Sequence, residues 1–125
     1  MKIMQCAHCG NQVFSLHDGG VPMMCCGEPM KELAAGSTDA ALEKHVPAVA
    51  VNGTTMQVTV GEVPHPMLAE HFIQWVAVEQ GDKVQFARLH PEGEPKAAFT
   101  IEPGKPYTVY EFCNLHGLWK AEGQA

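Results

Sequence analysis

The cysteine residues of this 125-residue chain have the spacing of metal ligands, and metal binding strongly limits how the chain can fold. Cys6 and Cys9 form one pair, and the adjacent residues Cys25 and Cys26 form a second pair further along. Four thiolates suit a tetrahedral site for a soft metal ion. The residues before about position 36 include few large apolar side chains, so we expect this segment to fold around a metal rather than around a hydrophobic core.

A second group combines four histidines with the remaining cysteine. Its members are His45, His65, His71, Cys113 and His116. Four imidazoles and one thiolate suit a redox-active transition metal, and five protein ligands leave one position of an octahedron open. An open position is typical of catalytic metals, because structural metals normally have closed coordination. The sequence therefore predicts small-molecule redox chemistry at this group, with the four-cysteine group as an electron relay.

The other three histidines stand apart from both groups. His8 lies inside the first cysteine pair but is surplus once four thiolates are counted, so we expect it to face solvent. His17 and His90 form no group with a cysteine or with each other, and we expect ordinary surface residues. At the four-cysteine site iron is favoured and structural zinc remains the alternative, because cysteine spacing alone does not separate the two metals.

Charge and composition argue against several classes of function. The formal net charge is −6 at pH 7, so the chain lacks the basic balance typical of nucleic-acid binding. No stretch approaches the roughly 20 apolar residues of a membrane span, and the residues before Cys6 lack the apolar core of a signal peptide. Five cysteines, an odd number, favour metal ligation in a reducing compartment over a disulfide framework. We therefore expect a cytoplasmic protein without nucleic-acid or membrane partners.

The pattern of apolar residues predicts an all-β chain. Turn-forming residues punctuate Cys6–Met30, and the small polar segment Ala34–Asp39 is typical of a linker. Asp39 is a candidate N-cap for one helical turn over Ala40–Lys44. Short apolar or alternating runs then predict strands over Thr54–Val60, Phe72–Glu79, Val84–Leu89, Ala97–Ile101 and Tyr107–Phe112. The expected architecture is a metal-stapled module over residues 1–36 followed by an antiparallel β-sandwich over residues 37–125.

Five segments of the chain carry a family resemblance: residues 6–10 (CAHCG), 25–30 (CCGEPM), 43–47 (EKHVP), 60–71 (VGEVPHPMLAEH) and 113–119 (CNLHGLW). Together they resemble desulfoferrodoxin, the two-iron class of superoxide reductase, over nearly the whole chain. The resemblance implies a desulforedoxin-like N-terminal module, whose iron is bound by Cys6, Cys9, Cys25 and Cys26. It also implies an immunoglobulin-like sandwich with a square-pyramidal iron, bound by His45, His65, His71 and His116 in the equatorial plane and by Cys113 on the axis.

The two residues before His45 also match the family motif. Glu43 corresponds to the carboxylate that takes the sixth position of the oxidised iron, and Lys44 to the cation that attracts superoxide. An acidic chain as a whole repels an anionic substrate, and a local cation would overcome that repulsion near the iron. The chain departs from the family pattern at Phe72 and Phe112, where tyrosine is frequent.

The activity that this resemblance implies is one-electron reduction of superoxide by ferrous iron, with uptake of two protons and release of hydrogen peroxide. It further implies two iron ions per chain, with the four-cysteine iron as an auxiliary electron-transfer centre. A rubredoxin-like protein or a flavoprotein reductase would be the electron donor, and the assembly would be a homodimer. Two alternatives stay open here: a two-iron electron carrier without a catalytic role, and a zinc-stapled binding module.

Overall fold

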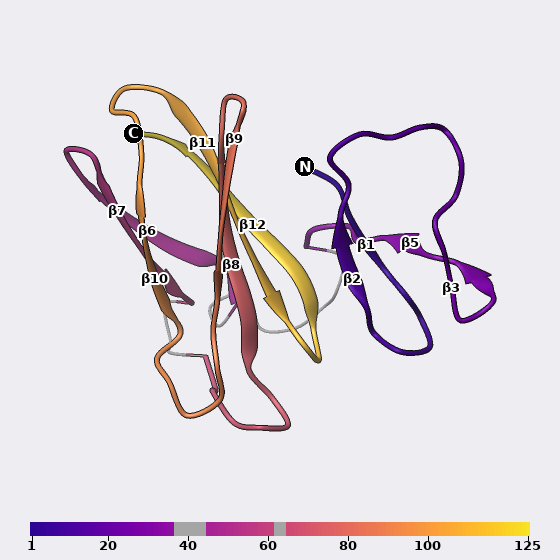
Figure 1. Cartoon of the computed structure of the whole chain (residues 1–125). Helices are drawn as coiled ribbons and strands as arrows, with labels where there is room; N and C mark the ends of the chain where they lie inside the picture. Colours follow the sequence, from indigo (N-terminus) through magenta and orange to yellow (C-terminus); the bar gives the residue numbers. More distant parts are fainter. Residues whose placement is uncertain (37–44, 62–64) are drawn as a thin grey trace. The chain divides into compact units, whose positions relative to one another are not determined.

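The computed structural model describes residues 1–36, 45–61 and 65–125 (Figure 1). These residues form two compact units, Met1–Ala34 and Ala35–Ala125. The named regular elements of the described residues are β-strands, so the predicted all-β class is confirmed. None of the described residues belongs to a helix that is long and apolar enough to cross a membrane. The helical turn predicted over Ala40–Lys44 lies outside the described residues.

The first unit contains five short strands in two small sheets. Its strands are β1 (Ile3–Gln5), β2 (Gln12–Phe14), β3 (Met24–Cys25), β4 (Glu28–Pro29) and β5 (Lys31–Glu32). Strand β1 lies between β2 and β5, and β3 pairs with β4 as a hairpin. Ile3, Cys6 and Met30 are its buried hydrophobic residues. A core of this size gives little stability alone, which agrees with a unit held together by a metal.

The second unit is a sandwich of two antiparallel sheets. Its strands are β6 (Pro47–Asn52), β7 (Thr55–Val60), β8 (Ile73–Gln80), β9 (Lys83–Arg88), β10 (Lys96–Thr100), β11 (Pro106–Cys113) and β12 (Gly117–Gln124). One sheet has the strand order β10-β7-β6 and the other the order β12-β11-β8-β9. Every adjacent pair is antiparallel, as the predicted sandwich requires.

The core lies between these two sheets, and strand β7 shows why. Its residues alternate between core and solvent, so Met56, Val58 and Val60 all point inward and are fully buried. They belong to one apolar cluster with Val76 of β8 and Val109 of β11. The five strands predicted in this unit all form, with ends that shift by at most one residue.

Strand β12 was not predicted, because its sequence carries only a weak strand signal. Two glycines and three polar residues among its eight positions weaken its preference for a strand. In the structure all eight of its residues pair with β11, from Cys113 opposite Gly117 to Pro106 opposite Gln124. Pairing along a complete neighbouring strand therefore overrides the weak local preference.

Candidate metal centres

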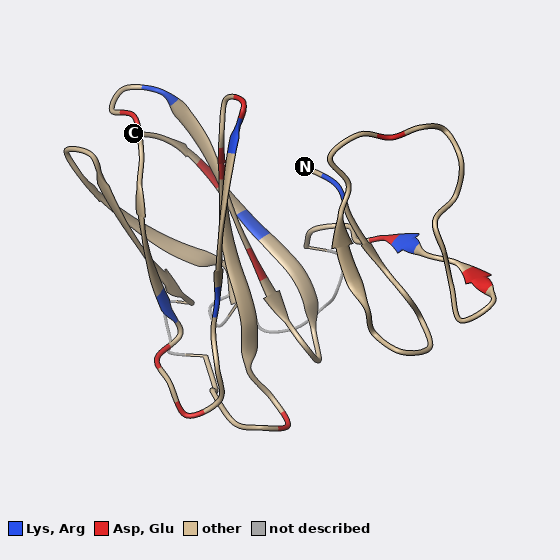
Figure 2. Ribbon diagram, viewed as in Figure 1, with Lys and Arg blue, Asp and Glu red and all other residues tan. Residues whose placement is uncertain are grey.

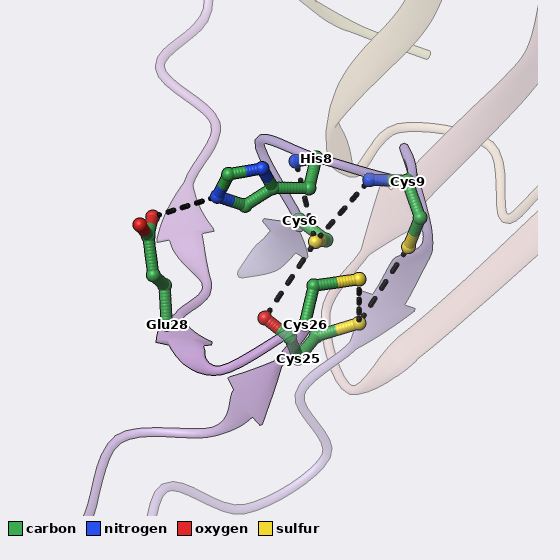
Figure 3. A network of polar contacts seen from close by, with 6 residues as sticks. All are labelled: Cys6, His8, Cys9, Cys25, Cys26 and Glu28. Carbon is green, nitrogen blue, oxygen red and sulfur yellow. Dashed lines mark hydrogen bonds and ion pairs between the residues drawn. The ribbon is translucent and has the colours of Figure 1, made fainter.

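The first centre is the group of four cysteine sulfurs in the N-terminal unit (Figure 3). All four Sγ atoms lie within 4.8 Å of one another. The Sγ atoms of Cys9 and Cys25 are 3.6 Å apart, and those of Cys25 and Cys26 are 4.0 Å apart. Metal–sulfur bonds of about 2.3 Å in a tetrahedron place neighbouring sulfurs about 3.8 Å apart. The observed separations therefore fit a single tetrahedral ion.

The loop from Cys6 to Cys9 points backbone N–H groups at a sulfur. The amides of His8 and Cys9 donate to Cys6 Sγ over 3.4 and 3.5 Å. The loop closes where the Gly10 amide donates to the Cys6 carbonyl over 3.1 Å, and Gly10 takes the left-handed φ of 80° that this turn needs. These amide donors, that of Cys9 first, lower the pKa of the Cys6 thiol to about 6. The loop thus favours the thiolate that a metal binds.

The adjacent cysteines meet because a tight turn separates them. Cys25 pairs with Glu28 across the β3–β4 hairpin, so Cys26 and Gly27 are its two loop residues. Both have left-handed backbone, with φ of 53° for Cys26 and 77° for Gly27, as in a type I′ turn. A non-glycine residue in this region costs about 1 kcal/mol or more. That strained turn brings the Cys26 sulfur to the same side as the Cys25 sulfur.

Crowding of the sulfurs opposes their ionisation in the absence of a cation. Contact with Cys9, then with Cys6 and Cys25, raises the pKa of Cys26 to about 12. The pKa of Cys25 is raised as well, mainly by Cys9. Four sulfurs this close cannot all ionise at neutral pH unless a metal ion compensates their charge. The donor set therefore fits the four-thiolate centre predicted from the sequence.

Three side chains around this centre have contacts that the sequence did not predict. The ring of His8, expected to be surplus, is exposed, but its Nε2 lies 3.1 Å from a carboxylate oxygen of Glu28, a contact that joins the two cysteine loops (Figure 3). The side-chain amide of Asn11 donates to Cys25 Sγ over 3.7 Å. The only sequence signal for these contacts was closeness to a cysteine pair.

The second centre lies in the sandwich, where the five predicted ligand residues come together. Each offers one ligand atom, and these atoms all lie within 4.8 Å of one another. His45 Nε2 is 3.1 Å from His65 Nε2 and 3.1 Å from His116 Nδ1. Two nitrogens bound at right angles, each about 2.1 Å from one ion, would be about 3.0 Å apart. The imidazole positions thus fit ligands that share one metal.

The β11–β12 hairpin places two of these residues. Cys113 ends β11 and pairs with Gly117, so Asn114, Leu115 and His116 form a three-residue loop. Gly117 has a φ of 85°, which is the left-handed conformation that such a loop needs at its end. A shift of register between Phe112 and Cys113 marks a β-bulge against β8, and bulges change the direction of nearby side chains. Cys113 Sγ lies 3.8 Å from His116 Nδ1.

Hydrogen bonding and burial prepare His65 for metal binding. Its Nδ1–H donates to the carbonyl of Pro66 over 2.7 Å, which leaves the Nε2 lone pair directed at the other ligands. Burial is the largest cause that lowers the pKa of His65, to about 4. The ring is therefore neutral at pH 7, as a ligand must be.

Two residues that the sequence analysis missed support the ligand loops. Asn114 accepts a hydrogen bond from the Phe72 amide over 2.9 Å and donates to the Glu70 carbonyl over 3.0 Å. It therefore ties the loop that contains His71 to the hairpin that contains Cys113. Trp119 stacks on the His45 ring at 5.1 Å, and its indole N–H donates to the His116 carbonyl over 3.2 Å.

A buried carboxyl group lies two residues before Cys113. Figure 2 colours the acidic residues red along the ribbon. Glu111 of β11 is completely buried. Neither of its oxygens has a hydrogen-bond partner in the described part of the chain. Burial raises the pKa of Glu111 to about 9, so the group is neutral at pH 7. It therefore adds no full negative charge beside the cysteine.

The remaining predicted residues either lie outside the described residues or belong to neither ligand group. Glu43 and Lys44 lie in the part of the chain that the structure does not describe. His17 and His90 are exposed and belong to neither ligand group. Phe112 is buried and stacks on Trp75 with an angle of 9° between the rings, so this position serves packing.

Both units match family models. Residues 1–33 match the N-terminal domain of desulfoferrodoxin, and residues 37–122 match the desulfoferrodoxin model. A desulfoferrodoxin homologue from Methanothermobacter thermautotrophicus is 46% identical over 118 residues, which cover 94% of this chain and 95% of the relative. A desulfoferrodoxin from Nitratidesulfovibrio vulgaris is 46% identical over 122 residues, with coverage of 97% and 95%.

A solved structure agrees with both sequence matches. The crystal structure of the superoxide reductase from Treponema pallidum has a TM-score of 0.76 and 32% identity, and the match covers 97% of this chain and 99% of the other. The four-cysteine group and the group of four histidines and one cysteine suit the two iron centres of this family. Sequence, fold and ligand sets therefore agree that the chain belongs to the desulfoferrodoxin family.

Proposed function

We infer that the chain is a superoxide reductase, which adds one electron and two protons to superoxide and yields hydrogen peroxide. The observation that carries this conclusion is the convergence of four imidazoles and one thiolate within 4.8 Å. Such a set binds a redox-active metal and leaves one coordination position open. The match to the superoxide reductase of Treponema pallidum supports the same activity.

We propose His45, His65, His71, His116 and Cys113 as the ligands of the catalytic iron. Iron bound there supplies a one-electron couple beside an open coordination position. The neutral imidazoles would add no negative charge, and the Cys113 thiolate would donate electron density to the iron. The Nδ1–H of His65 and the stack of Trp119 on His45 hold the rings in orientation.

We propose that Glu43 and Lys44 act on the open side of this iron. Both precede His45 directly in the chain, so each is tied to a ligand. Lys44 would attract superoxide by its charge, and Glu43 would offer a carboxylate to the oxidised iron. This assignment rests on the sequence motif.

The four-cysteine iron is proposed as an auxiliary electron-transfer centre, bound by Cys6, Cys9, Cys25 and Cys26. Its closed coordination allows one-electron transfer without a site for substrate. A rubredoxin-like protein or a flavoprotein reductase would supply the electrons.

We place the module boundary at residue 36, with the superoxide reductase domain over residues 37–125, and the family matches over 1–33 and 37–122 support this division.

The test compares the wild-type protein with the Cys25→Ser variant. Wild type should contain two irons per chain and the variant one, because the ligand sets share no residue. Pulse-generated superoxide should disappear at similar rates with both ferrous proteins, with one peroxide per superoxide and no dioxygen. Slow consumption by both would favour a plain electron carrier instead. One zinc and no iron in wild type would favour a zinc-stapled binding module.

We also propose that the protein is a cytoplasmic homodimer. All five cysteines are free, as expected in a reducing compartment. The first unit exposes several apolar side chains, among them Leu16 at 89%, Val21 at 79% and Met24 at 61%. A second copy could cover them, since this unit buries little apolar surface. Sedimentation at micromolar concentration should give a dimer, and a monomer alone would contradict the assembly.

A further inference from the structure

Hydrogen bonds reach the sulfurs of the first centre from two kinds of donor. Cys6 Sγ accepts from the backbone amides of His8 and Cys9. Cys25 Sγ accepts from the side-chain amide of Asn11 over 3.7 Å. A backbone donor is present whatever the side chain, but the donor to Cys25 depends on the identity of residue 11. The hydrogen bonding of one thiolate is therefore set by a single replaceable side chain.

The backbone of Asn11 is held independently of that side chain. Its carbonyl accepts the Cys6 amide over 2.9 Å, and Gly10 makes the turn that precedes it. Asn11 also lies directly before β2, which pairs with β1. A change of side chain at position 11 therefore leaves the contacts that shape the cysteine loop in place.

Donors to a metal-bound thiolate affect the two oxidation states unequally. An added electron makes a four-thiolate centre more negative, so an N–H dipole directed at a sulfur stabilises the reduced state more than the oxidised state. The same dipole lowers the energy of the sulfur lone pairs. Removal of the donor should therefore lower the reduction potential and move the thiolate-to-iron absorption to longer wavelength.

We propose that Asn11 is a positioning residue that raises the reduction potential of the four-cysteine iron through its hydrogen bond to Cys25. The proposal deepens the electron-transfer role above and rests on it for its biological meaning. A higher potential makes this centre a better acceptor of electrons from the donor protein. The potential itself is a property of the centre and can be measured whether or not electrons pass onward.

The test is a redox titration of the two-iron protein, followed through the absorption of the first centre. In Asn11→Leu and Asn11→Ala the equilibrium constant for reduction should fall by about three- to tenfold, where tenfold corresponds to about 59 mV for one electron. The effect is modest because Asn11 is exposed and water replaces part of the lost bond. Asn11→Gln retains an amide donor and should recover part of the potential.

A matched control is Asn52→Leu, the same substitution at an exposed position of β6, which should leave potential and absorption unchanged. Asn11→Ala decides the result if the larger leucine disturbs the loop. Potentials and absorption equal to wild type in iron-loaded Asn11→Ala would overturn the proposal. Superoxide consumption is measured in parallel and should not change, so failure of this inference is distinguishable from failure of the proposed activity.

Discussion

His65→Ala is expected to leave one iron per chain and to slow the reaction with superoxide by more than about a hundredfold. His65 is 97% buried, with 3% of its surface exposed, and its Nε2 lies 3.1 Å from that of His45. Loss of an outer hydrogen-bond partner of a ligand already costs roughly 10- to 100-fold in metal affinity or activity. Loss of the ligand itself should cost more. Iron analysis and the decay of pulse-generated superoxide give the two readouts.

The control for this variant is His90→Ala. His90 is exposed and belongs to neither ligand group, so this variant should keep two irons and the wild-type rate. Added imidazole can occupy the space that His65→Ala leaves and should restore part of the iron binding. An alanine variant with full iron content and a fast reaction would show that His65 is not a ligand.

Lys44→Ala should slow the second-order reaction with superoxide by roughly three- to a hundredfold while both irons remain bound. A unit charge about 6 Å from the anion contributes roughly 0.7 kcal/mol in bulk water and about 3 kcal/mol at an effective dielectric constant near 20. The difference from wild type should shrink at high salt, because ions screen the charge. Superoxide decay measured across ionic strength checks both statements.

Two further variants separate charge from position. Lys120→Ala removes the same charge from β12, where Lys120 pairs with Glu122 at the surface, and should have a much smaller effect. Glu43→Ala should keep the fast association and change the absorption of the oxidised iron, since its proposed role follows oxidation. A Lys44→Ala rate equal to wild type at low salt would disprove the steering role.

The strands of the sandwich were predictable because burial on one face leaves a period of two in the sequence. Met56, Val58 and Val60 show this period directly, and all three are fully buried. Strand β12 left a weaker mark, because only Leu118 and Trp119 among its side chains are buried, while all eight of its residues pair along β11. Pairing between strands is a tertiary property, and local sequence reports it poorly.

The supporting residues of the centres were hidden for the same reason. Asn114 bonds to Phe72 and Glu70, 42 and 44 positions away. Asn11 reaches Cys25 across 14 positions. An asparagine in a turn is common for reasons of backbone geometry alone, so its type does not reveal a distant partner.

The sequence by itself determined which atoms of this protein can bind metal, because ligand chemistry belongs to the residue type. Thiolates and imidazoles in two separate sets predicted two centres, one closed and one open. Only the tertiary structure decided how those atoms meet. His45 and His116 are 71 positions apart, and their ring nitrogens lie 3.1 Å apart. Strand register and the bulge before Cys113 set the geometry of the second centre, and the turn at Cys26 sets that of the first, because distances in space follow from packing and not from order in the chain.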